Sequence, residues 1–194
     1  MALSWVGADP IVSLEDEVRE AQQIQRNYML ARDATLEAFN WTFAMKRFIP
    51  GKLTAAPEFG GLNAFDIPFD IMRVVAVYGD TVNWLLPWQG VEDEQADWVV
   101  ETGQILSSRE AIYCLGIRYM EDEGSYSPLF NMAFAAHLAM LVSIPLTASS
   151  SIEDKMSARF DYYLEQAQTL TAMQGRSRRL RNRSKQQARA GVRR

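Results

Sequence analysis

The chain has 194 residues, of which 48% are hydrophobic and 23% charged, with 20 Lys and Arg against 24 Asp and Glu. This composition excludes collagen-like, wholly disordered and disulfide-scaffold proteins, and it suffices for one compact domain. The single cysteine, Cys114, cannot form a disulfide within the chain, and residues 1–10 lack the basic and apolar regions of a signal peptide. We expect a soluble protein made in the cytoplasm.

Basic residues concentrate at the C-terminal end. Residues 175–194 contain nine basic side chains and no acidic one: Arg176, Arg178, Arg179, Arg181, Arg183, Lys185, Arg189, Arg193 and Arg194. The first 174 residues carry 11 basic and 24 acidic side chains, a net charge of −13. A segment of this kind seeks an anionic partner, either nucleic acid or an acidic protein surface. We therefore predict a docking tail over 175–194, attached to an acidic body.

A long helix is predicted over about residues 13–40. Apolar residues recur there at three- and four-residue spacing, at Leu14, Val18, Ala21, Ile24, Tyr28 and Ala31. Ser13 is a candidate N-cap, and the acids at 15–17 suit the positive first turn of a helix.

Between about residues 42 and 120 the pattern changes to the two-residue period of strands. Apolar residues alternate at Phe65, Ile67, Phe69 and Ile71, and again at Tyr113, Leu115, Ile117 and Tyr119. Residues 72–78 form a β-branched run, and glycines at 51, 60, 61, 79, 90 and 103 indicate turns. We predict several short antiparallel strands in this insertion.

Two further helices are predicted after the insertion. Ser127 and Pro128 have the order of an N-cap and a first helical residue, and that helix is expected over 128–144, ending before Pro145. The last helix is expected over 150–174, where Ser150 and Glu153 have capping-box spacing. The predicted fold is α+β: a single domain over 1–174, in which a helical bundle carries an antiparallel β-sheet insertion.

The first of these two helices is apolar enough to raise the question of a membrane span. Residues 128–146 hold 14 apolar residues among 19, but Asn131, His137 and Ser143 interrupt them. A bilayer span needs about 20 apolar residues. We therefore predict a helix buried in the protein, and no membrane.

The residues needed for catalysis or cofactor binding are scarce. His137 is the one histidine and no G-x-S-x-G motif accompanies it, so we interpret it as a core histidine bonded to backbone or water. Cys114 is interpreted as a buried small hydrophobe. One Cys and one His cannot build a structural zinc site, and no phosphate-binding glycine loop is present. The acids at 92–97 and 121–123 suit solvated loops or contacts with a basic partner. We expect no enzyme activity and no cofactor.

One stretch of 15 residues inside the insertion contains three tryptophans, namely Trp84, Trp88 and Trp98. Tryptophan is enriched among the residues that anchor protein interfaces. We predict that these three contact a neighbouring subunit or another protein, with a role in the core of the insertion as the alternative.

The succession of segments resembles the tail tubular protein A family of short-tailed, T7-like bacteriophages. The segments that carry the resemblance are 36–44 (LEAFNWTFA), 65–74 (FDIPFDIMRV), 117–120 (IRYM), 128–130 (PLF), 133–139 (AFAAHLA) and 144–147 (IPLT). The resemblance covers about residues 10–172 and does not include the basic tail. It implies a helical bundle with a β insertion, and a head-to-tail adaptor or gatekeeper. In this family twelve copies form a ring between the portal and the tail nozzle.

Three functions follow as hypotheses. The first is a structural virion protein at the head–tail junction, whose partners are its own copies, the portal protein and the nozzle protein. DNA would pass through the ring during genome ejection without sequence-specific binding, and the acidic body would repel its phosphates. The second is a nucleic-acid-binding protein that uses the basic tail, although this tail has no aromatic residue for base stacking. The third, a hydrolase that uses His137, is the weakest.

Overall fold

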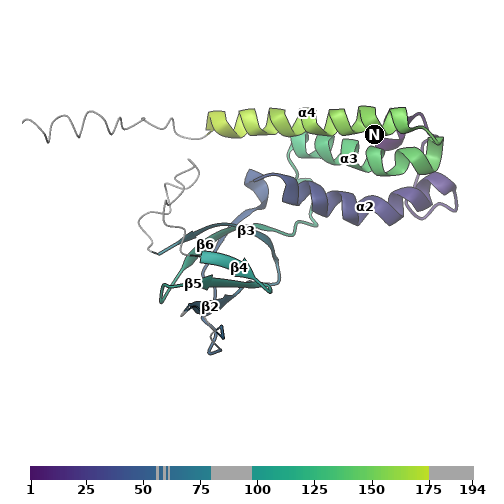
Figure 1. Cartoon of the computed structure of the whole chain (residues 1–194). Helices are drawn as coiled ribbons and strands as arrows, with labels where there is room; N and C mark the ends of the chain where they lie inside the picture. Colours follow the sequence, from purple (N-terminus) through teal and green to yellow (C-terminus); the bar gives the residue numbers. More distant parts are fainter. Residues whose placement is uncertain (56, 59, 61, 80–97, 175–194) are drawn as a thin grey trace, which may run out of the picture.

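The computed structural model describes residues 1–55, 57–58, 60, 62–79 and 98–174. These residues form four α-helices and two small antiparallel sheets, which confirms the predicted α+β class (Figure 1). The helices are α1 (Ala2–Val6), α2 (Arg19–Ala38), α3 (Pro128–Thr147) and α4 (Ser150–Gln174), with 3-10 turns η1 (Thr42–Ala44) and η4 (Glu123–Ser125). The strands are β1 (Met45–Phe48), β2 (Asn63–Asp66), β3 (Ile71–Tyr78), β4 (Trp98–Glu101), β5 (Gln104–Ser107) and β6 (Tyr113–Arg118).

The first long helix begins later than predicted, at Arg19 rather than at residue 13. Ser13 does not cap it, because its Oγ accepts a 3.1 Å hydrogen bond from the N–H of Glu15. The Asp16 carboxylate accepts bonds from the N–H groups of Val12 and Ser13, at 3.0 and 3.1 Å. Such local bonds between short polar side chains and the backbone compete with helix formation. The acids at 15–17 therefore belong to a loop that leads into α2.

The helix α3 begins as predicted and ends later than predicted. Ser127 Oγ accepts a 3.2 Å bond from the N–H of Phe130, so Ser127 is the N-cap. The helix continues past residue 144 and includes Pro145 in its last turn. It ends at Ala148, which has a left-handed φ of 52° and donates its N–H to the helix at 2.9 Å. The predicted bounds of the last helix, 150–174, are those of α4.

The core of the bundle forms around α3, which packs against α1, α2 and α4. Phe130, Ala136 and Val142 of α3 are fully buried. Among the described helices, α3 alone is long and apolar enough to cross a membrane, and 50% of its most apolar window is buried inside the protein. Because helices cover it on several sides, the packing favours a core helix.

The β unit consists of two three-stranded sheets, in the orders β1-β6-β3 and β2-β5-β4. A cluster between them holds Phe65, Val77, Ile105, Ile112 and Cys114. The segment that follows β1 joins the sheets, because residues 51–53 lie alongside β2: the Leu53 N–H donates to the Ala64 carbonyl at 2.8 Å, and the Asp66 N–H to the Gly51 carbonyl at 3.0 Å.

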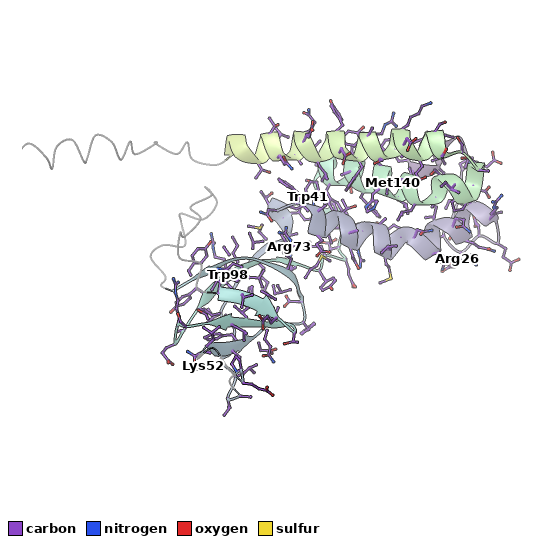
Figure 2. All side chains as sticks on the ribbon, in the orientation of Figure 1. Arg26, Trp41, Lys52, Arg73, Trp98 and Met140 are labelled. Carbon is purple, nitrogen blue, oxygen red and sulfur yellow. The ribbon has the colours of Figure 1, made fainter. Side chains whose placement is uncertain are left out.

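The β unit lies beside the end of α2 (Figure 1), and one partly buried arginine contributes to the contact. Arg73 of β3 donates a 2.7 Å hydrogen bond to the side chain of Asn40, which follows α2. Figure 2 shows Arg73 on the side of the β unit that faces the bundle, and Lys52 on the far side. The sheet β1-β6-β3 is therefore fixed to the bundle near the start of β3.

The alternating segment 65–71 is not one strand, which corrects the strand pattern expected from the sequence. Strand β2 ends at Asp66 and β3 begins at Ile71. Residues 68–71 form a turn, closed by a 2.9 Å hydrogen bond from the N–H of the last residue to the carbonyl of the first. Proline and aspartate favour this turn, because proline fixes φ and aspartate favours turn conformations.

Candidate interaction site

The turn 68–71 presents Phe69 to solvent and is held on two sides. The N–H of Tyr119, which follows β6, donates a 2.9 Å bond to the carbonyl of Asp70. The carboxylate of Asp70 also forms a 2.5 Å ion pair with Lys46 of β1. Contacts from β1 and from the residue that follows β6 therefore fix the backbone on which Phe69 stands.

Phe69 itself is 96% exposed, although it is one of the most apolar residue types. Full burial of such a side chain is worth roughly 1.5–3 kcal/mol, which the isolated chain does not gain. Tyr119 beside it is also exposed. Both line a surface hollow of about 510 Å³ together with Asp70, Arg118, Met120, Glu121 and Asp122. Aromatic anchors surrounded by charged groups are typical of protein interfaces.

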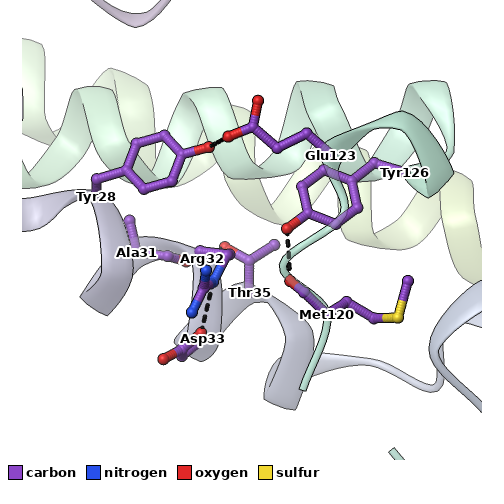
Figure 3. A network of polar contacts seen from close by, with 8 residues as sticks. All are labelled: Tyr28, Ala31, Arg32, Asp33, Thr35, Met120, Glu123 and Tyr126. Atoms are coloured by element: carbon purple, nitrogen blue, oxygen red, sulfur yellow. Dashed lines mark hydrogen bonds and ion pairs between the residues drawn. The ribbon is translucent and has the colours of Figure 1, made fainter. Parts of the chain in front are cut away.

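The back of this hollow is held against the bundle by the contacts in Figure 3. The Tyr126 hydroxyl donates a 2.7 Å bond to the Met120 carbonyl, and the Tyr28 hydroxyl of α2 donates to Glu123. Burial and the carboxylate of Glu123 raise the pKa of Tyr28. Asp122 accepts a 3.1 Å bond from the N–H of Gly124, which caps η4. The acids at 122 and 123, predicted as part of a solvated loop, therefore have structural partners.

A second surface feature lies at the other end of the same sheet. It is an apolar pocket of about 370 Å³, where β1 and β3 end and β6 begins. Its lining residues are Arg47, Phe48, Ile49, Tyr78, Tyr113, Cys114 and Leu115. The Tyr78 hydroxyl is buried and has no hydrogen-bond partner among the described residues. Burial raises the pKa of Tyr78 to about 12, and the positive charge of Arg47 acts in the opposite direction.

The cysteine in this pocket, Cys114, has low reactivity. Cys114 is buried in the cluster between the two sheets, which agrees with its interpretation as a small hydrophobe. Burial raises the pKa of the Cys114 thiol to about 12. Because the thiolate is the nucleophilic form, a thiol with this pKa is a poor nucleophile near neutral pH.

The strand β3 separates the Phe69 turn from the pocket. It begins with Ile71, the last residue of the turn, and ends with Tyr78, which lines the pocket. The seven steps from Ile71 to Tyr78, at about 3.3 Å each, place the two features roughly 23 Å apart along the strand. One end of the sheet therefore presents an exposed aromatic side chain, and the other end an apolar cavity.

His137 does not face either feature. Its Nδ1 lies 3.1 Å from the Thr35 hydroxyl, which donates a 2.6 Å bond to the Ala31 carbonyl. Its ring packs on Phe160 at 4.8 Å between centroids, and burial lowers its pKa. This agrees with the predicted core histidine: His137 bonds to the backbone of Ala31, and the Thr35 hydroxyl is a further partner that was not predicted. Within the described ranges, no group of three or more His, Cys, Asp or Glu side chains could hold a metal ion.

The residues predicted from the sequence as contact sites lie mostly outside the described residues. Trp84, Trp88 and all nine basic residues of the tail are among those outside. Trp98 begins β4 and packs, partly buried, against the cluster between the sheets, so part of its ring belongs to the core. The exposure of Phe69 was not predicted, because the alternation around it suggested a strand; Pro68 was the signal against that strand.

A scan against protein-family models and a search of curated proteins found no match to this chain.

Proposed function

We propose that this chain is a structural subunit of a bacteriophage head-to-tail adaptor, in which a ring of copies joins the portal to the tail nozzle around the DNA channel. The observation that supports it best is the architecture: one long helix, a β unit and two further helices, in this order. This is the arrangement implied by the resemblance to the tail tubular protein A family. That resemblance rests on sequence segments, and the fold agrees with it.

Exposed apolar side chains add support. Met29 and Leu30 of α2 are each 61% exposed, and Ile144, Tyr162 and Leu170 are exposed on α3 and α4. Single apolar residues on a surface are ordinary. In a ring, however, every subunit has two neighbours, and side-to-side contacts would remove such residues from water.

The charge distribution suits a conduit for DNA. Residues 1–174 carry a net charge of −13, which would repel phosphate from the channel wall. The tail over 175–194 would dock on the portal, where its guanidinium groups would pair with carboxylates. The tryptophans at 84, 88 and 98 would contact a neighbouring copy or the nozzle.

The test is native mass spectrometry and negative-stain microscopy of the protein, with and without the portal of the phage that encodes it. We expect a ring, of twelve copies if it follows the family, bound to one end of the portal. A protein that stays monomeric in the presence of portal would overturn the proposal. The tail is tested by deleting 175–194, and by a second variant of full length in which Gln replaces its nine basic residues. Both variants should lose portal binding.

The same samples test the runner-up. A nucleic-acid-binding protein would bind DNA at low salt, with an affinity that falls steeply as salt rises and a slope that drops by several units when the tail is deleted. DNA binding of this kind, without any binding to portal, would replace the adaptor by the second hypothesis.

A further inference from the structure

We propose that Phe69 of one copy inserts into the apolar pocket beside Tyr78 and Tyr113 of the next copy, and that this contact joins neighbouring subunits. The inference rests on the proposed ring and identifies the surfaces that would build it. The partner is a second copy of this chain.

Phe69 is an exposed side chain on a backbone that hydrogen bonds and an ion pair hold in place. The turn 68–71 is closed by its own hydrogen bond, and Tyr119 and Lys46 hold Asp70 from two strands. An exposed aromatic side chain on a fixed backbone loses little conformational entropy when it binds. A core residue would lack the exposure, and a loosely held loop residue would lack the fixed backbone.

The pocket and the Phe69 turn are complementary in polarity and in charge. The pocket has walls of Phe48, Tyr78, Tyr113 and Leu115, and a cavity of about 370 Å³ suits an aromatic side chain. The exposed carboxylate of Asp66 lies three residues before Phe69, whereas Asp70 is already paired with Lys46, and the pocket carries the guanidinium of Arg47. An apolar side chain near an acid thus meets an apolar cavity beside a cation, which favours the right orientation of two copies.

Phe69 and the pocket lie at opposite ends of β3 in one chain. Because β3 separates the turn from the pocket, the Phe69 of a chain cannot reach the pocket of that same chain. A contact between two different surfaces is heterologous, so an open row of copies has a free Phe69 at one end and a free pocket at the other until the assembly closes. A pair related by a two-fold axis would stop at two copies, whereas this contact continues around a ring.

The decisive experiment is cross-linking between two introduced cysteines, Phe69→Cys and Ile49→Cys. Ile49 lies at the pocket and is 72% exposed, so a cysteine there is accessible, whereas the native Cys114 is buried. With a short thiol–thiol cross-linker, the chain that carries both cysteines should form a ladder of dimers, trimers and larger species. The matched control pairs Val12→Cys, at a position 99% exposed in the loop before α2, with Ile49→Cys, and should give no ladder.

A series of substitutions, without cross-linking, tests how much this contact contributes to the stability of the ring. Phe69→Ser should raise the concentration at which rings form at least tenfold, while Val12→Ser, the removal of an equally exposed apolar side chain, should leave it unchanged. Arg47→Glu should weaken assembly, and Asp66→Arg in the same chain should restore part of it. Thermal unfolding of each variant verifies that the fold is retained.

The outcomes separate this inference from the proposed function. Rings that form on the portal but show no cross-link between 69 and 49, or that tolerate Phe69→Ser, would overturn the inference and leave the adaptor function standing. A chain that stays monomeric with portal present would overturn both. A ladder from the 69 and 49 pair alone, together with the Phe69→Ser effect, would support the contact.

Discussion

The indole N–H of Trp41 donates a 2.7 Å hydrogen bond to the main-chain carbonyl of Thr35. Thr35 lies in the last turn of α2, where four carbonyls have no partner within the helix. The ring of Trp41 is buried and meets Phe39 and Phe130 edge-on, each at 5.1 Å between centroids. One side chain thus caps α2, fills the core and directs the chain toward the β unit.

Replacing Trp41 by Phe should lower the free energy of unfolding by about 1–3 kcal/mol, because it leaves the buried carbonyl of Thr35 without its donor. Urea unfolding followed by circular dichroism measures the change. Trp5→Phe is the matched control: Trp5 is only partly buried on α1, and its loss should cost less. Equal losses for both variants would contradict the role assigned to this hydrogen bond.

Gly116→Ala should destabilise the β unit by about 1–3 kcal/mol through overpacking. A Cβ at this position of β6 would lie 2.9 Å from the Arg73 carbonyl and 3.1 Å from the ring of Phe48. Gly51→Ala is the control, because a Cβ there meets nothing within 4 Å. Thermal unfolding of the two variants should differ clearly, and similar midpoints would show that β6 can shift to make room.

Thr102→Asn should stabilise the protein by roughly 0.5–1 kcal/mol. Thr102 and Gly103 form the two-residue turn between β4 and β5, and their φ angles are 48° and 76°. A β-branched residue is strained at positive φ, whereas Asn-Gly is favoured in such hairpin turns. An increase in the urea midpoint measures the gain, and no increase would mean that the strain at Thr102 is relieved by other contacts.

Stability should fall as the pH drops from about 7 toward 5, in part because of His137. Burial lowers the pKa of His137 from its ordinary value of 6.5, so below that pH the unfolded state binds a proton that the folded state does not. His137→Gln should therefore flatten the pH dependence in this window, even if it lowers stability at pH 7. Because the chain has one histidine, its pKa can be followed directly by NMR. A native pKa at or above 6.5 would contradict this account.

Sequence patterns predicted the elements whose signals are local. Ser127 and Pro128 marked the start of α3, since a cap and its helix are neighbours in the chain. The predicted start of α4 at residue 150 is confirmed, with Ser150 as the first residue of the helix. The predicted start of α2 was wrong because the side chains of Asp16 and Ser13 bond to nearby backbone within the preceding loop. The sequence pattern does not show whether such side chains will cap a helix or bond within a loop.

The candidate interaction site was harder to predict, because its two parts depend on contacts between distant segments. The exposure of Phe69 follows from the bonds that Lys46 and Tyr119 make to Asp70, 24 and 49 residues away in the chain. The pocket exists because β1 and β3 end where β6 begins, which strand pairing alone decides. A two-residue alternation around Phe69 describes a strand equally well, so composition could not distinguish a turn there.

The short run 51–53 has a consequence for how the β unit unfolds. Because its backbone bonds to β2 while the preceding residues pair with β6, a single stretch of chain belongs to both sheets. Neither sheet can detach without breaking the bonds of the other, so their amide protons should exchange with deuterium together, as one cooperative body. A limited protease should accordingly release the β unit whole or leave it uncut, and half of it should not accumulate as a stable fragment.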